Sequence, residues 1–120
     1  MTYNAEHVVQ AQLDAYNQKD IDAWSNIYAP TAVQLLIDGT VLARGRDAIK
    51  ANIAERFKEP DLYAKLISRQ VFDNVVIDHE LITRNFDEGK GSVEMLCIYL
   101  VEDSVICRAE FKVFNKIIFK

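Results

Sequence analysis

The stretch that decides the fold is Val75-Val76-Ile77-Asp78-His79-Glu80-Leu81-Ile82-Thr83, which alternates with the two-residue period of a β-strand. One face of this strand would carry Val75, Ile77, His79, Leu81 and Thr83, and the other would carry Val76, Asp78, Glu80 and Ile82. Because the first set is the more apolar, we expect it to face the interior. His79 would then line a cavity closed by helices from the first half of the chain. Asp78 and Glu80 would lie outside, either solvated or paired with Arg69 or Arg84.

Composition limits the classes of protein that this chain can form. With 120 residues, half of them hydrophobic, it fits a single domain spanning 1–120 with an ample core. The net charge is −4 and the 14 basic residues are scattered, which argues against nucleic acid or an anionic membrane surface as a partner. No apolar run approaches the roughly 20 residues of a membrane span. The first residues, Met1 to His7, lack the features of a signal peptide, so we expect a cytoplasmic protein.

Three helices are predicted in the first half of the chain. Asn4 is a good N-cap for a helix over 5–18, whose inner stripe is Val9, Leu13 and Tyr16. Asp20 would cap a second helix over 21–28, which Pro30 ends. A third helix is expected from about 46 to 58.

Strands account for most of the remaining chain. Residues 32–37 and 41–44 form a hairpin around Asp38-Gly39, and four further strands are expected near 62–72, 75–85, 93–102 and 105–114. Helices gathered on one side of a mostly antiparallel sheet give an α+β domain. A strongly curved sheet wrapped around three helices would enclose a cone-shaped space.

Several segments together resemble a known family. They are Val8 to Val33, with its Asn17-x-x-Asp20 linker between two helices, Gly45-Arg46-Asp47-Ala48-Ile49 before the third helix, and Val76 to Glu80 in the central strand. Their order and spacing resemble nuclear transport factor 2-like (SnoaL-like) domains over about residues 5 to 114. The resemblance implies a cone-shaped α+β barrel and a homodimer. The superfamily includes isomerases, dehydratases, epoxide hydrolases, polyketide cyclases and non-catalytic members, so the fold alone leaves the function open.

The catalytic sets of this superfamily are not matched in the chain. Laid on the ketosteroid isomerase pattern, Leu36 stands at the position of the base, Gln12 at that of the tyrosine and Cys97 at that of the donating acid. An alkyl group cannot abstract a proton, so this mechanism is not expected. The Asp-Arg-Asp set of limonene epoxide hydrolase is missing as well. Only a scheme like that of scytalone dehydratase, with one histidine and nearby tyrosines, keeps some support, and His79 is its best candidate.

His79 has three interpretations. It is a neutral interior histidine satisfied by a tyrosine hydroxyl or a backbone carbonyl, a hydrogen-bonding group for a ligand, or a general acid or base. Gln34 likewise is either bonded to backbone at a sheet edge or points into the pocket. The predicted pocket residues are Tyr16, Gln34, Leu36, His79, Met95, Cys97, Tyr99 and Phe111.

No metal or cofactor is expected. Cys97 and Cys107 lack zinc spacing, and without a secretory signal they are interpreted as reduced thiols, although neighbouring strands would also allow a disulfide.

Three functional hypotheses follow from the sequence. The first is a protein that binds a small hydrophobic or aromatic molecule in a conical pocket. The second is a cofactor-independent lyase or isomerase that uses His79 with a tyrosine. The third is a dimeric scaffold whose cavity is filled by its own side chains. In each case, strands that are apolar on both faces favour a homodimer formed through the open face of the sheet.

Overall fold

The computed structural model describes residues 4–120; residues 1–3, and with them part of the expectation about a signal peptide, lie outside it. The helices are α1 (Ala5–Gln18), α2 (Ile21–Asn26) and α3 (Arg46–Arg56). The strands are β1 (Tyr28–Leu36), β2 (Val41–Arg44), β3 (Tyr63–Phe72), β4 (Val75–Phe86), β5 (Gly89–Glu102) and β6 (Val105–Ile118). The predicted order of helices and strands is therefore confirmed.

All six strands join one open sheet in the order β2-β1-β6-β5-β4-β3. Only β1 and β6 run parallel, and the other neighbours are antiparallel. Register shifts occur in five places, between Tyr28 and Val33, Gln34 and Leu35, Leu66 and Ser68, Ser92 and Glu94, and Leu100 and Val101. Such irregularities bend strands, and the long strands of this sheet curve strongly.

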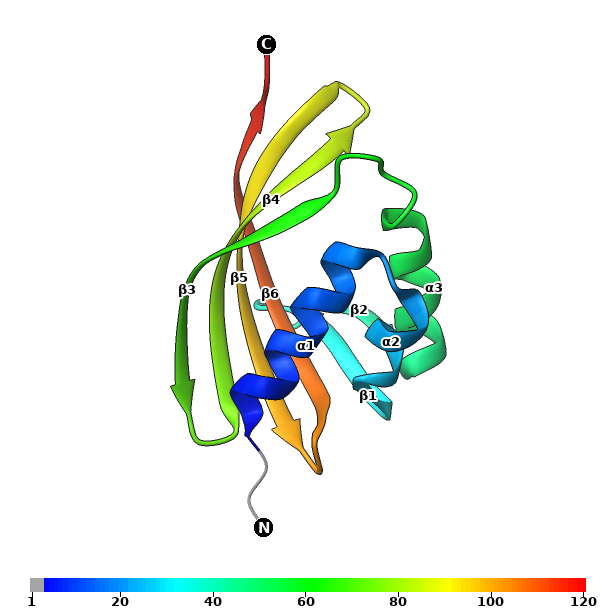
Figure 1. Ribbon diagram of the computed structural model, residues 1–120, viewed down its shortest axis with the longest axis vertical. Helices are drawn as coiled ribbons and strands as arrows, with labels where there is room; N and C mark the ends of the chain where they lie inside the picture. Colours follow the sequence, from blue (N-terminus) through cyan, green and yellow to red (C-terminus); the bar gives the residue numbers. More distant parts are fainter. Residues whose placement is uncertain (1–3) are drawn as a thin grey trace.

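In Figure 1 the three helices lie together on one side of the sheet. The predicted α+β fold is confirmed, with β2 and β3 as the free edges of a sheet that does not close.

The helices begin where the sequence supplies caps. The Asn4 side chain accepts a hydrogen bond from the His7 backbone nitrogen, and Asp20 does the same for Ala23. Helix α1 ends at Lys19, which has a left-handed conformation with φ of 56°.

Several predicted boundaries need correction. Strand β5 begins at Gly89 rather than near 93, and β6 ends at Ile118 rather than near 114. Helix α2 ends at Asn26 rather than Tyr28, and Pro30 lies inside β1 instead of ending the helix. Proline is tolerated there because the pairing of β1 with β6 is interrupted between Tyr28 and Val33, so no ladder hydrogen bond is lost.

The core lies between the helices and the concave face of the sheet. Val9, Trp24, Ile49, Val76 and Tyr28 are at most 3% exposed and come from five of the elements that meet there. Asn17 ties the end of α1 to the sheet, since its side chain both donates to and accepts from the backbone of Ala64, at 2.9 and 2.8 Å. No helix among residues 4–120 is long and apolar enough to cross a membrane.

Candidate functional site

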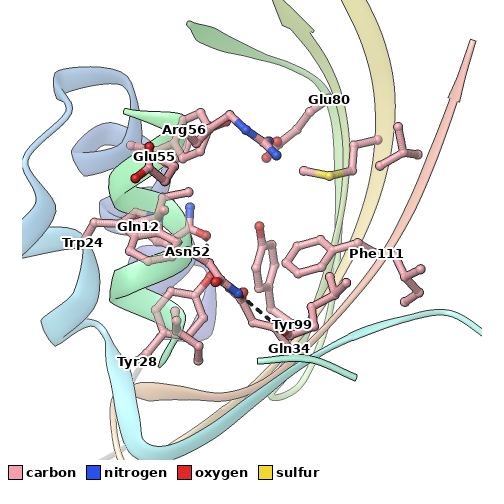
Figure 2. A pocket seen from close by; sticks show the side chains of 18 of the residues that line it. Gln12, Trp24, Tyr28, Gln34, Asn52, Glu55, Arg56, Glu80, Tyr99 and Phe111 are labelled. Carbon is pink, nitrogen blue, oxygen red and sulfur yellow. Dashed lines mark hydrogen bonds between the residues drawn. The ribbon is translucent and has the colours of Figure 1, made fainter. Parts of the chain in front are cut away.

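A cavity of about 510 Å³ lies between the three helices and the concave face of the sheet. Figure 2 shows side chains from both sides pointing into it. Helices α1 and α2 contribute Gln12, Leu13, Tyr16 and Trp24, and α3 contributes Ile49, Ala51, Asn52, Ile53, Glu55 and Arg56. The sheet contributes Tyr28, Gln34, Leu36, Leu42, Glu80, Met95, Tyr99, Phe111 and Val113.

Aromatic rings form much of the wall. The Trp24 and Tyr28 rings lie 4.8 Å apart, and the Tyr99 and Phe111 rings meet edge to face at 6.2 Å. Tyr16 contacts Phe57 edge to face at 5.5 Å. Aromatic pairs prefer tilted or edge-to-face geometries of this kind, and the wall that they form is mostly apolar.

A neutral polar pair lies deep in the pocket. The Tyr28 hydroxyl donates to Gln12 Oε1 at 3.1 Å, and both side chains are buried. Burial raises the pKa of Tyr28, so the hydroxyl stays protonated and remains a donor.

The inner face of β4 carries two acidic side chains in different states. Asp78 is fully buried and receives two hydrogen bonds from Arg69, at 2.7 and 2.9 Å. A third nitrogen of Arg69 donates to Gln10 on α1, at 2.8 Å. This buried ion pair has both carboxylate oxygens satisfied, as the interior of a protein requires.

Glu80 lacks such a partner. Its side chain lines the pocket at 3% exposure, and no ion pair involving it is present among residues 4–120. Burial, with the nearby Asp78 carboxylate, raises the pKa of Glu80 from 4.5 to about 7, against a lowering by Arg69 and by a hydrogen bond with Cys97. The carboxyl therefore exchanges its proton near neutral pH.

Arg56 supplies a cation at the same end of the pocket as Glu80 (Figure 2). Its Nε lies 3.5 Å from Glu59, which Arg84 also binds at 2.8 Å. Burial raises the pKa of Tyr16 to about 12, and Arg56 opposes that rise. Tyr16 and Arg56 thus present an O–H and N–H groups at this end of the cavity.

Six of the eight predicted pocket residues line the cavity. They are Tyr16, Gln34, Leu36, Met95, Tyr99 and Phe111. Cys97 lies behind the wall, fully buried, where its thiol contacts Glu80 and Tyr99. Burial raises the pKa of Cys97, so the thiol stays neutral. Cys97 and Cys107 are both free thiols, and the disulfide alternative is wrong.

His79 does not face the cavity, and this expectation is corrected. The strand has the predicted period of two with the opposite phase, because Val76, Asp78, Glu80 and Ile82 are the buried set. On the outer face, His79 Nε2 lies 2.7 Å from Glu94 Oε1 and the ring stacks on Phe114. Asp78 and Glu80 are correspondingly inside rather than outside. Arg69 makes this phase possible by neutralising Asp78, which is one of the two pairings expected for it.

Sequence reasoning missed the part of the pocket contributed by α3. The predicted pocket residues include none from that helix, yet Asn52 and Arg56 line the cavity. A helical spacing of three and four residues from Ile49 through Asn52 and Ile53 to Arg56 was the available signal. Among residues 4–120, no cluster of three or more histidine, cysteine or acidic side chains is placed to hold a metal ion.

Comparison with known proteins places this geometry in context. The sequence model of the SnoaL-like domain family matches residues 9–109. An uncharacterized cystatin-fold protein from Novosphingobium aromaticivorans is 22% identical with a TM-score of 0.84, covering 92% of this chain and 99% of that one. A candidate polyketide cyclase from Sinorhizobium meliloti is 21% identical with a TM-score of 0.73, covering 92% and 100%. An LEH-like epoxide hydrolase from M. tuberculosis is 14% identical with a TM-score of 0.76, covering 91% and 81%.

At these identities the solved structures show a shared fold and nothing finer. No curated protein matches the chain. The family model covers most of the chain. Solved structures that resemble the chain include proteins with ketosteroid isomerase-like and nuclear transport factor 2-like folds. The chain therefore belongs to the SnoaL-like domain family, and its fold is nuclear transport factor 2-like.

Proposed function

We propose that this protein binds a small, largely apolar molecule with an aromatic or other planar skeleton in the pocket between its helices and its sheet. The cavity of about 510 Å³ carries this proposal. Pockets for small molecules usually enclose about 300–1,000 Å³, with apolar walls and a few placed polar groups. A scaffold with a cavity filled by its own side chains would lack this space.

The wall chemistry supports the same class of ligand. The rings of Tyr99, Phe111 and Trp24 offer faces and edges on which a planar molecule can stack. The polar groups lie in two regions, one around Gln12 and Tyr28 and the other around Arg56 and Glu80. A ligand with one or two oxygen atoms on an apolar skeleton would satisfy this pattern.

Thermal unfolding in the presence of planar hydrophobic compounds tests the proposal. A compound present at 100 times its Kd stabilises the folded protein by about 2.7 kcal/mol. The fluorescence of Trp24, the single tryptophan, gives an independent signal from the pocket wall.

Two matched variants localise the binding. Ile53→Phe places a larger side chain in the pocket, which reduces the space for a ligand, so the thermal shift should be abolished. His79→Phe places the same ring on the outer face of the sheet and should preserve the shift. A shift that survives Ile53→Phe, or no shift across steroids, polyketides, terpenes and aromatic acids, would contradict the proposal.

A further inference from the structure

We propose that Glu80 is a proton-accepting catalytic group of this pocket, acting on small planar molecules that carry a weakly acidic C–H or O–H bond beside an electron-withdrawing group. This inference rests on the proposed function, because the molecule must first occupy the pocket. Beyond binding, the pocket would have an activity, a catalytic residue and a class of substrate.

The three acidic side chains in or beside the cavity differ in what holds them. Asp78 is fixed in its ion pair with Arg69. Glu55 lies at the rim, with 76% of its side chain exposed and Lys58 at 3.1 Å. Glu80 alone among the three lines the pocket, is almost fully buried and has no ion-pair partner in residues 4–120. Its carboxylate is therefore the one that no paired cation holds and that can take a proton from a bound molecule.

The surroundings of Glu80 suit proton transfer near neutral pH. The titratable or charged groups around it are Asp78 on its own strand, Arg69 on β3, Cys97 and Tyr99 on β5, Tyr16 on α1, Tyr28 on β1 and, across the pocket, Arg56 on α3. Burial and the Asp78 carboxylate raise its pKa to about 7, although Arg69 and the hydrogen bond with Cys97 act in the opposite direction. A base with a pKa near the working pH is partly ionised and still basic enough to accept a proton.

Donors at the same end of the pocket complete the arrangement. The Arg56 side chain reaches toward the end that holds Glu80 (Figure 2), and Tyr16 lies beside it. A molecule that loses a proton to Glu80 becomes negatively charged on its electron-withdrawing group. The guanidinium and the phenol hydroxyl would stabilise that charge in an apolar environment, where such hydrogen bonds have their largest effect.

A nitro-substituted benzisoxazole is a suitable probe because it is planar, small and needs only a base. The Glu80 carboxylate takes the proton on the ring carbon, the C–H electron pair forms the third bond of a nitrile, and the N–O bond breaks. The product is a coloured cyano-nitrophenolate, and the proton on Glu80 then passes to water. No oxidant, metal or second substrate takes part.

The experiment measures probe binding and elimination separately in the wild-type protein, Glu80→Gln and His79→Gln. Binding is read from Trp24 fluorescence and thermal shift, and elimination from product absorbance. We expect a saturable rate that rises with pH about a midpoint near 7. Glu80→Gln should bind the probe and lose at least about 100-fold in rate. His79→Gln, one residue away on the opposite face, should keep the full rate.

The outcomes separate this inference from the proposed function. A probe that binds but reacts no faster than in buffer, or reacts equally fast in Glu80→Gln, overturns the role of Glu80 and leaves the binding function standing. A probe that does not bind at millimolar concentration, together with failure of the wider panel, removes both.

Discussion

Replacing Glu80 by Gln should stabilise this protein above neutral pH and have much less effect in acid. The pKa of Glu80 is raised in the folded state, from 4.5 to about 7, chiefly because burial penalises the charged carboxylate. Between these two values the folded protein holds a proton that the unfolded chain has released. The free energy of unfolding therefore decreases as pH rises through this window. Glutamine has nearly the same shape and no charge, so it escapes this penalty.

The size of the effect follows from the two proton affinities. Each tenfold difference in affinity corresponds to about 1.4 kcal/mol, so moving the pKa from 4.5 to about 7 destabilises the folded state by about 3 kcal/mol once Glu80 is ionised. The carboxyl is 3% exposed, so solvent screening reduces this value little. Any difference in packing between Glu and Gln is the same at every pH. It cancels when the effect of the substitution in acid is subtracted from its effect in base.

Urea unfolding of the wild type and of Glu80→Gln, near pH 4 and near pH 8, measures this difference. We expect the stabilisation by Glu80→Gln to be larger near pH 8 than near pH 4 by about 3 kcal/mol. Glu94→Gln is the matched control on the outer face. Hydrogen bonds from Asn115 and His79 lower the pKa of Glu94, so its contribution to stability is present at high pH and is lost in acid. For Glu94→Gln, the stabilisation near pH 8 minus the stabilisation near pH 4 should therefore have the opposite sign. A difference near zero for Glu80→Gln would refute the assignment of Glu80 as a buried, ionising group.

Three further predictions concern the framework around the pocket. Arg69→Met leaves the Asp78 carboxylate buried without its cation, so the free energy of unfolding at neutral pH should fall by about 3–5 kcal/mol, and a fall below about 1 kcal/mol would contradict the buried pair. Asn17→Ala leaves the backbone N–H and C=O of Ala64 without their partners, so the free energy of unfolding should fall by about 2 kcal/mol. An unchanged free energy of unfolding would show that water replaces both hydrogen bonds. We also propose a homodimer through the outer face of the sheet, so the wild type should sediment as a dimer at micromolar concentration and Ile98→Asp as a monomer; a monomeric wild type would refute this.

The arrangement of the elements could be predicted because each one has a local signal. Side-chain caps start α1 and α2, and polar turn residues at 73–74 and 103–104 separate the long strands. The end of α2 could not be placed from sequence. A proline that follows a helical segment normally ends the helix. Here Pro30 lies in the stretch of β1 where pairing with β6 is interrupted, and only the assembled sheet shows that stretch.

The phase of β4 could not be predicted for a different reason. Alternation separates the two faces of a strand but does not say which face is inside when both carry apolar residues. Here the outer face keeps Ile77 and Leu81 partly exposed, while the inner face holds the two acids. Asp78 is tolerated inside only because Arg69, on the neighbouring strand, reaches it with two hydrogen bonds. The sequence shows the arginine but not the direction of its side chain, and without that direction the pattern favours the histidine over the glutamate as the pocket residue.

The energetics of Glu80 connect the stability prediction with the proposed chemistry. A folded protein gains nothing in stability from an acid that destabilises it by about 3 kcal/mol when ionised, and a glutamine or a leucine at this position would avoid that penalty. Asp78, two residues earlier, shows that this fold can supply an arginine where it buries a structural carboxylate. Within the described residues 4–120, Glu80 has no such partner and instead opens onto the cavity. Strongly perturbed acids that face a cleft are typical of functional sites. If Glu80→Gln both stabilises the protein at high pH and stops proton transfer to the probe, the same unpaired carboxylate explains both results.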